Sequence, residues 1–182
     1  MVDLTMVIDC HCRGTKPIKD FTPYIDRRNS VQHNLMSLPS GAELVEDEIT
    51  SVCLYEAIRH TAFIYSAAVT FPIPALSGHF HKLAAILQPL LEASKFDTCW
   101  RRCPKTLLWI LVLGGIAASD TNERGWFVRS IAMVAKILKI GTWEEVTEIM
   151  ESFLWLDSAC DAGGRILWAE VRSRRFLRSS SG

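Results

Sequence analysis

The stretch from Leu107 to Ala118 constrains the fold more than any other part of this chain. It runs for twelve residues without a charged side chain. As a helix it would rise about 18 Å, far less than the ~30 Å of a membrane's hydrocarbon core. A helix that is apolar on every side needs other helices packed around it. The stretch therefore predicts a buried helix, at about residues 104–118, in the centre of a protein core.

Helical spacing of apolar residues recurs through most of the remaining sequence, and no useful alternating apolar–polar run occurs. The other segments with this spacing lie at about 22–38, 47–70, 79–94, 121–138, 142–154 and 165–176. We therefore predict an all-α fold, a single irregular bundle of about seven helices around the central one. The expected domain organisation is an irregular or disordered segment at 1–21, one helical domain at 22–176 and a disordered tail at 177–182.

Several helix boundaries can be predicted from capping residues. Thr142 and Glu145 have the spacing of a capping box, and Pro104 suits the first turn of the central helix. Other expected boundaries are a cap at Thr121 or Asn122, a kink or division at Pro89, a helix end at Gly141 and a last helix after Gly163-Gly164. The residues expected to face the core include Ile25, Val31, Leu35 and Leu38 in the first helix, and Phe127, Ile131, Val134, Ile137 and Leu138 in the fifth.

The charge balance and the cysteines limit the class of protein. Lys plus Arg equals Asp plus Glu, 20 each, so the whole chain has no field that would attract nucleic acid or an anionic membrane. The six cysteines are scattered, which fits reduced thiols inside a cell better than a disulfide framework. The first residues carry no basic region before their short apolar run, so we expect no signal peptide. These features predict an intracellular protein without a transmembrane segment.

Three groups of residues carry the side chains of metal ligands. They are Cys10-His11-Cys12, the pair Cys99 and Cys103, and the pair His79 and His81. Neighbouring side chains diverge, and no second cluster stands at the spacing of a zinc ribbon or finger. Two histidines that are two residues apart on a helix point in roughly opposite directions. We therefore expect no metal site and no cofactor.

Catalytic signals are equally weak. The sequence contains no nucleophile elbow and no phosphate-binding loop, and Gly114-Gly115 lacks the Lys-Ser/Thr that would follow such a loop. We expect this glycine pair to let a neighbouring backbone come close. Cys53 and His60 are seven residues apart and would share one helix face, as core residues also do. The prediction is that the chain has no catalytic residues and is not an enzyme.

Glu56 interrupts an apolar stripe, with Arg59 three and His60 four residues further on. One interpretation is an ordinary exposed helix pair, which stabilises a helix by a few tenths of a kcal/mol. The other is a buried, paired carboxylate that fixes the register of the helix. The apolar neighbours favour the second interpretation.

The six tryptophans and the arginines near the carboxyl end each have two interpretations. Tryptophans at this density can line a ligand pocket, but core and helix-end packing is the favoured role. The arginines fit a solvated terminus better than a basic patch for import or for an acidic partner. The tryptophans are Trp100, Trp109, Trp126, Trp143, Trp155 and Trp168, and the arginines are Arg165, Arg172, Arg174, Arg175 and Arg178.

From Arg28 onward, the order of several short motifs resembles the fungal-specific transcription factor domain, over roughly residues 28–170. Each motif is weak by itself, but their order and spacing together are fairly specific. The motifs are Val31-Gln-His33, Leu35-Met-Ser-Leu-Pro39, Tyr55-Glu56 with Arg59, Ile64-Tyr65 before Phe71-Pro72, Leu107-Leu-Trp109, Gly114-Gly-Ile-Ala-Ala118, Glu123-Arg124 with Trp126-Phe127, Trp143-Glu-Glu-Val146, Phe153-Leu-Trp155, Cys160-Asp161 and Trp168.

The resemblance implies an all-α regulatory domain that adjusts transcription of metabolic genes in the nucleus, and it brings no catalytic residues. In that family a zinc cluster of six cysteines in a compact basic segment contacts DNA. Before residue 28 this chain has only Cys10 and Cys12. We therefore expect no direct sequence-specific DNA binding by this chain.

The leading hypothesis is a non-enzymatic, transcription-regulator-like helical domain without its own DNA-binding motif. It would act through protein or small-molecule contacts: the expected partner is a protein, either a related transcription factor or a second copy of itself, and a small-molecule effector is the other candidate. The alternative is a small intracellular enzyme or accessory protein with a tryptophan-lined pocket, in which Cys53 and His60 would be the best reactive pair. An enzyme should bring titratable groups together in a concave pocket, whereas a regulatory domain should expose an apolar surface patch.

Overall fold

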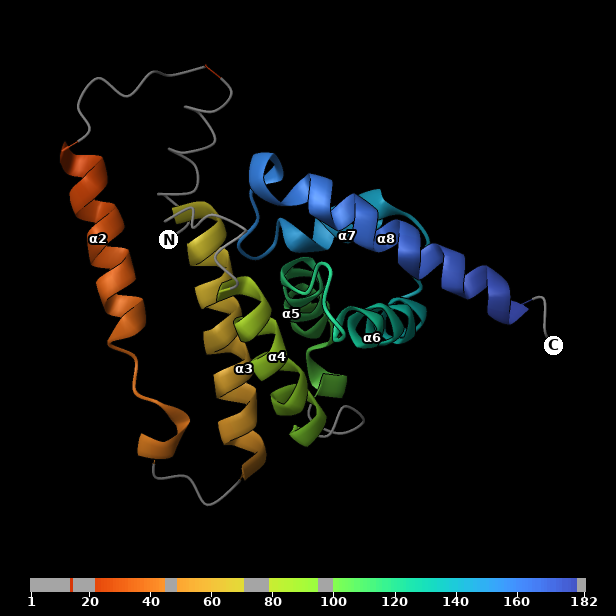
Figure 1. Cartoon of the computed structure of the whole chain (residues 1–182), viewed down its shortest axis with the longest axis horizontal. Coiled ribbons are helices and arrows are strands. Elements are labelled where there is room, and N and C mark those ends of the chain that lie inside the picture. Colours follow the sequence, from red (N-terminus) through yellow and green to blue (C-terminus); the bar gives the residue numbers. More distant parts are fainter. Residues whose placement is uncertain (1–13, 15–21, 45–48, 71–78, 95–99, 180–182) are drawn as a thin grey trace.

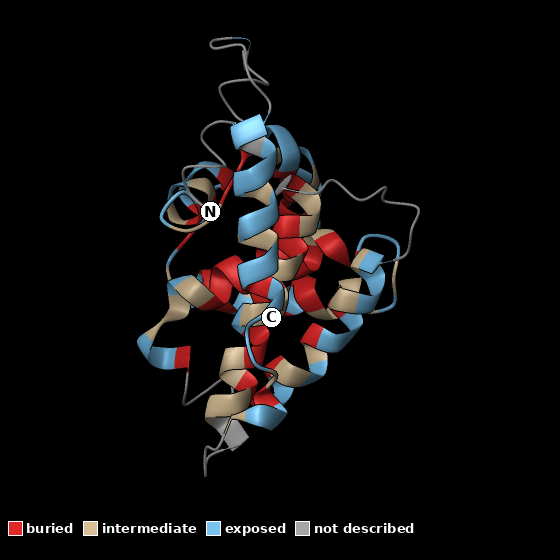
Figure 2. Cartoon of the chain, turned by 90° about the vertical axis from the view of Figure 1, so that its left-hand side faces the viewer, coloured by how far each residue is buried: buried red, intermediate tan, exposed pale blue. Residues whose placement is uncertain are grey.

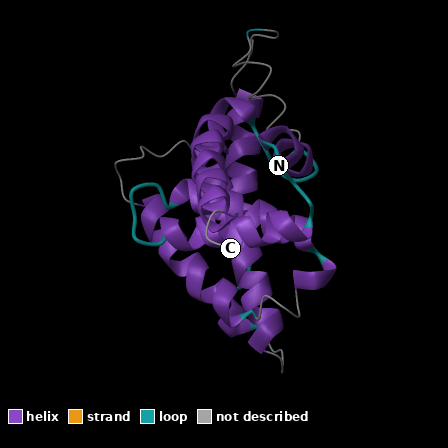
Figure 3. Ribbon diagram, turned by 90° about the vertical axis from the view of Figure 1, so that its right-hand side faces the viewer, coloured by secondary structure: helices purple, strands orange, loops and turns teal. Residues whose placement is uncertain are grey.

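The computed structural model confirms the all-α fold. It describes residues 14, 22–44, 49–70, 79–94 and 100–179. Within these ranges the chain forms seven α-helices and no strand (Figures 1 and 3). The expected irregular segment at 1–21 lies outside the described residues, except for Gly14.

The helices follow the predicted order along the chain. They are α2 (Thr22–Met36), α3 (Ile49–Tyr65), α4 (His79–Ala93), α5 (Pro104–Ala117), α6 (Arg124–Ile137), α7 (Trp143–Met150) and α8 (Asp157–Ser179). Two short 3-10 turns, η1 (Gly41–Glu43) and η5 (Trp100–Arg102), precede α3 and α5. A π-helical turn, η2 (Ser66–Thr70), continues α3.

Helix α5 lies at the centre of the bundle, as its sequence predicts. It contacts α3, α4, α6, α7 and α8, and every residue from Leu107 to Gly115 is buried. Figure 2 shows the buried segments gathered in the interior, with exposed surfaces on the outer helices. A helix with no polar face is stable here because its neighbours cover all its sides.

The glycine pair in α5 makes this close packing possible. A Cβ on Gly114 would lie 2.6 Å from Phe127 Cε1 and 2.7 Å from Leu87 Cδ2, and one on Gly115 would lie 2.7 Å from Leu167 Cδ2. The predicted close approach is therefore present. The prediction that a neighbouring backbone makes it is wrong, because side chains of α4, α6 and α8 fill the space.

Helix α8 begins at Asp157, so the prediction of a last helix after Gly163-Gly164 is wrong. Both glycines lie inside the helix. A Cβ on Gly164 would lie 2.3 Å from Trp143 Cη2, and one on Gly163 would lie 3.0 Å from Ile116 Cγ2. Glycine suits position 164 because Trp143 occupies the space of a Cβ, and at position 163 a Cβ would make a tight contact with Ile116. The expected tail start, residue 177, also falls within α8.

The end of α6 differs from the prediction as well. Gly141 does not end the helix. Lys139 adopts the left-handed conformation, with φ of 58°. The N–H of Ile140 donates to the carbonyl of Ala135 at 2.8 Å, and the N–H of Lys139 donates to that of Lys136 at 3.2 Å. This pair of bonds is a Schellman motif, with a lysine in the position where glycine is usual.

Of the predictions at Thr142, Pro104 and Pro89, the first two agree with the structure and the division at Pro89 does not. The capping box at Thr142 and Glu145 is confirmed, with the N–H of Glu145 donating to Thr142 Oγ1 at 3.2 Å. Pro104 lies in the first turn of α5 as expected. Pro89 does not divide α4, which continues through it.

The start of α6 lacks the predicted cap. Glu123 is the N-cap residue, and it makes no side-chain capping bond. Instead of capping α6, the hydroxyl of Thr121 donates to the carbonyl of Ala118 at 3.1 Å. This hydroxyl therefore helps to close the carboxyl end of α5.

Helix α2 is covered less than predicted. Its principal contacts are with α3 and η2, and Figure 1 shows it on one side of the other helices. Of its predicted core stripe, Leu35 is buried and Val31 is half-buried, whereas Ile25 and Leu38 are exposed. The stripe is only partly covered by the described part of the chain, in which α3 and η2 are the main elements that pack against this helix.

Candidate functional site

The carboxylate of Glu56 is buried and paired, as the favoured interpretation predicts. Its side chain on α3 accepts a hydrogen bond from the backbone N–H of Gly41. Arg59 Nη1 lies 3.0 Å from Glu56 Oε2, and His60 Nδ1 lies 3.1 Å from the same oxygen. Burial alone would raise the pKa of Glu56. The hydrogen bonds from Gly41 and Arg59 outweigh burial and hold that pKa below its usual value.

This cluster connects two segments of the chain. Gly41 belongs to η1, and the hydroxyl of Tyr55 donates to the carbonyl of Pro39 at 2.8 Å. Both contacts fasten the segment before α3 to the side of that helix. The buried carboxylate of Glu56 therefore has a structural role, because it helps to hold this segment on α3.

The pair Cys53 and His60 is not joined by a hydrogen bond among the described residues. Cys53 is buried on α3. Nδ1 of His60 lies 2.9 Å from the carbonyl oxygen of Glu56, so this nitrogen is directed toward Glu56. The arrangement lacks the nucleophile–base contact that activates a thiol.

Five of the six tryptophans are buried, which fits the favoured packing role. Four of them donate their indole N–H to a nearby oxygen. These are Trp100 to Ser94 Oγ at 2.7 Å, Trp109 to the Leu154 carbonyl at 2.9 Å, Trp143 to Asp161 Oδ1 at 2.7 Å and Trp155 to Asp157 Oδ1 at 3.0 Å. Leu154, Asp157 and Asp161 lie around the start of α8, where the rings of Trp143 and Trp155 are 6.0 Å apart, whereas Ser94 follows the end of α4. The tryptophans therefore do not form one common pocket.

Two tryptophans, Trp143 and Trp168, contribute to an open groove of about 360 Å³ between α7 and α8. Arg165, one of the arginines noted near the carboxyl end, also lines it. Its Nε donates to Asp161 Oδ2 at 2.7 Å, and its Nη1 lies 3.8 Å from Glu144 Oε1. Arg165 is therefore paired with carboxylates, whereas Arg172, which also lines this groove, is exposed.

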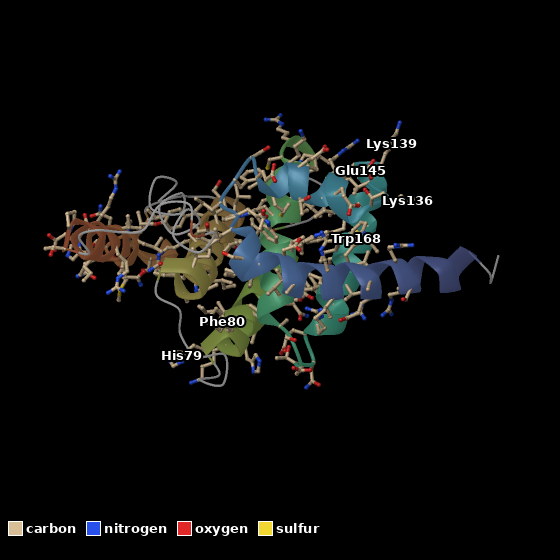
Figure 4. All side chains as sticks on the ribbon, turned by 90° about the horizontal axis from the view of Figure 1, so that it is seen from above. His79, Phe80, Lys136, Lys139, Glu145 and Trp168 are labelled. Atoms are coloured by element: carbon tan, nitrogen blue, oxygen red, sulfur yellow. The ribbon has the colours of Figure 1, made fainter. Side chains whose placement is uncertain are left out.

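Metal-ligand side chains do not gather in the part of the chain that the structure describes, where no group of three His, Cys, Asp or Glu could hold an ion. His79 and His81 are exposed at the start of α4, and Figure 4 shows His79 at a distance from Trp168. Cys103 is half-buried. Cys10-His11-Cys12 and Cys99 lie outside the described residues.

An apolar groove of about 400 Å³ lies between η5, the first turn of α5 and the second half of α6. We call it the α5–α6 groove. Its lining residues are Trp100, Arg101, Pro104, Leu107, Met133, Val134 and Ile137. Trp100 and Leu107 belong to the buried core, whereas Met133 is 46% exposed and Ile137 is 66% exposed.

The exposure of Ile137 corrects the prediction that it faces the core. Ile137 is the last residue of α6, and the chain reverses two residues later at Lys139. Spacing places Ile137 on the same stripe as Val134, but no described element covers the end of the helix. Sequence reasoning missed this groove because an exposed isoleucine at helical spacing looks like a core residue.

The elements that form the α5–α6 groove are strongly basic although the whole chain is neutral. The segments Trp100–Arg102, Pro104–Ala117 and Arg124–Ile137 contain no aspartate or glutamate. Their cations are Arg101, Arg102, Lys105, Arg124, Arg129 and Lys136. Arg124 is paired with Glu170 at 2.8 Å, and the other five are exposed. Figure 4 shows Lys136 on the outside of the molecule.

No helix among the described residues is both long and apolar enough to cross a membrane.

Comparisons with known proteins identified no relative of this chain. No protein-family model matches the chain, and searches of the curated proteins and of the solved structures found no match.

Proposed function

We propose that this chain is a non-enzymatic helical regulatory domain, of the type found in fungal transcription factors, which acts in the nucleus by binding a protein partner. The observation that carries the proposal is the α5–α6 groove, where Met133 and Ile137 expose apolar surface beside a rigid core. Exposed apolar patches that are rimmed by polar residues are typical of interaction sites. The order of short motifs along residues 28–170 supports the transcriptional context.

The titratable groups support a binding role rather than catalysis. Glu56 and Asp161 have lowered pKa values, and in both cases hydrogen bonds from neighbouring groups outweigh the effect of burial. These bonds attach Glu56 to η1 and Asp161 to Trp143 and Arg165. Perturbed groups that serve as structural ties are a poor match for a catalytic constellation.

A reporter assay tests the proposal. The chain is fused to an unrelated DNA-binding domain, and expression of a reporter gene is compared with that given by the DNA-binding domain alone. The fusion should change reporter expression, and the double variant Met133→Ser/Ile137→Ser should abolish that change. Ile166→Ser is the matched control because Ile166 is 62% exposed on α8 and outside the groove.

Equal expression from the fusion and from the DNA-binding domain alone would contradict the regulatory role. A fluorescent fusion of the chain should accumulate in the nucleus. The chain by itself should give no sequence-specific gel shift at ~150 mM salt. Tight, sequence-dependent shifts would show that it contacts DNA directly.

A further inference from the structure

We infer that the α5–α6 groove binds an acidic amphipathic helix of a protein partner. This inference rests on the proposed function, because it names the chemistry of the partner that the regulatory domain would recognise. The groove is the described surface where exposed apolar side chains, a buried aromatic wall and exposed cations occur together.

The groove has walls that are fixed before any partner binds. Trp100 is 1% exposed, and its indole N–H donates to the hydroxyl of Ser94 at 2.7 Å, which holds the ring in place. Leu107 belongs to the central helix, and Pro104 fixes the first turn of that helix. A site with rigid walls loses little conformational entropy when a partner docks.

The exposed face of α6 has the pattern that an amphipathic helix would complement. Arg129, Met133, Lys136 and Ile137 are all exposed and occupy positions i, i+4, i+7 and i+8 of one helix face. Two apolar side chains therefore alternate with two cations along this face. A partner helix with apolar residues at similar spacing would cover the two apolar side chains, and carboxylates beside those residues would pair with the two cations.

The charge of the surrounding elements selects the sign of the partner. Arg101 lines the groove, Arg102 and Lys105 are exposed beside it, and the three groove-forming elements hold no carboxylate. Complementary charge steers a partner to the site and disfavours like-charged competitors. A nucleic acid would use the cations but leave Met133 and Ile137 exposed. An acidic helix buries the apolar pair as well, so it is the occupant that the surface favours.

The direct test is a fluorescence anisotropy titration of the full chain with a labelled peptide. The peptide is a designed helix of about 16 residues, with leucines at helical spacing and glutamates beside them. A second peptide has the same composition in scrambled order, and a third replaces its glutamates with lysine. The acidic helix should bind, more weakly at high salt, while the other two peptides should bind at least about tenfold more weakly.

Two double variants, with two single variants as controls, test whether the peptide binds at the groove and the exposed face of α6. Met133→Ser/Ile137→Ser should weaken binding of the acidic helix by about tenfold or more, and Arg129→Glu/Lys136→Glu should weaken it similarly. Ile166→Ser and Arg174→Glu, at exposed positions on α8, should leave the affinity unchanged. Far-UV circular dichroism confirms that each variant remains folded.

Equal binding of the scrambled peptide would overturn the inference. Unchanged binding by both the Met133→Ser/Ile137→Ser and the Arg129→Glu/Lys136→Glu variants would overturn it as well. Tighter, groove-dependent binding of duplex DNA or of anionic phospholipid vesicles would also overturn it, because the site would then serve another class of partner. The reporter assay separates this failure from failure of the proposed function. A reporter change that depends on Met133 and Ile137, without binding of the acidic helix, would reject only the acidic partner.

Discussion

Replacing Gly164 with alanine should destabilise the fold, even though alanine is the better helix former. A Cβ at this position would lie 2.3 Å from Trp143 Cη2 and 2.5 Å from Trp143 Cζ2. The indole cannot move away easily. It is 5% exposed, its N–H donates to Asp161 Oδ1 at 2.7 Å, and its ring lies 6.0 Å from that of Trp155. The new methyl group must therefore displace packed core structure.

The expected magnitude follows from two opposing effects. The helix propensity of alanine contributes about 1 kcal/mol in favour of the variant. Overpacking of a filled core costs about 1–3 kcal/mol, and the upper part of that range applies because the Trp143 ring is held at two sides. The net loss should be about 1–2 kcal/mol, which lowers Tm by roughly 3–6 °C in a chain of this length. Urea unfolding followed by far-UV circular dichroism measures it without relying on tryptophan fluorescence.

Two further variants make the reasoning refutable. Gly125→Ala in α6 is the matched control, because the nearest atom to its new Cβ, Arg129 Nη1, lies 3.6 Å away. It should be neutral or stabilise by about 0.5 kcal/mol. Combining Gly164→Ala with Trp143→Phe removes the clashing ring atoms, so the two changes should couple favourably. A Gly164→Ala protein as stable as the wild type, or the absence of such coupling, would refute the steric argument.

Three more predictions concern single side chains. Lys139→Gly should raise Tm by a degree or more. The change relieves about 1–2 kcal/mol of strain in the left-handed backbone conformation, and the greater unfolded-state entropy of glycine offsets only part of this gain. A lower Tm would contradict the Schellman assignment. Glu56→Gln should cost about 1–2 kcal/mol at pH 7. The folded pKa of Glu56 is below the unfolded value of about 4.3, so its contribution is complete above that pH and disappears as the pH falls through the folded pKa. The Tm difference between Glu56→Gln and the wild type should therefore vanish in strong acid, and equal Tm values at pH 7 would reject the buried ion pair. Burial raises the pKa of the Cys160 thiol to about 11, so peptide-resolved iodoacetamide labelling at pH 8 should modify Cys160 more slowly than the half-buried Cys103, and faster labelling of Cys160 would show that α8 opens.

The parts of the fold that could be predicted from sequence depend on local patterns. The unbroken apolar run in α5 and the capping box at Thr142 each involve residues that are close along the chain. One boundary that was wrong depends on distant contacts, whereas the two ends of α6 depend on local bonds that helical spacing alone does not reveal. Gly163-Gly164 looks like a helix break until Trp143 and Ile116 are seen in the space of the missing side chains.

The groove was missed for a related reason. Helical spacing places Ile137 on the buried stripe of α6, but burial also requires a neighbouring element at that level of the helix. Nothing in the local sequence specifies where α5 and α6 stop covering one another. The basic character of the region is likewise hidden in the total charge, because carboxylates elsewhere balance it. By contrast, burial of Glu56 was predicted because its apolar neighbours are local.

The attachment of α2 and η1 also implies how this protein should open from its native state. Among the described residues, α2 is held by the hydrogen bond from Ser66 of η2 to Gln32 and by packing on α3 and η2, while η1 and the segment before it are held by the Glu56–Gly41 and Tyr55–Pro39 bonds. Segments with few buried contacts open locally at a small fraction of the global unfolding energy. Amide protons of α2 should therefore exchange with solvent through local opening, independently of those in α5. The chain would then behave as two cooperative units in hydrogen exchange, with α2 as the less stable one.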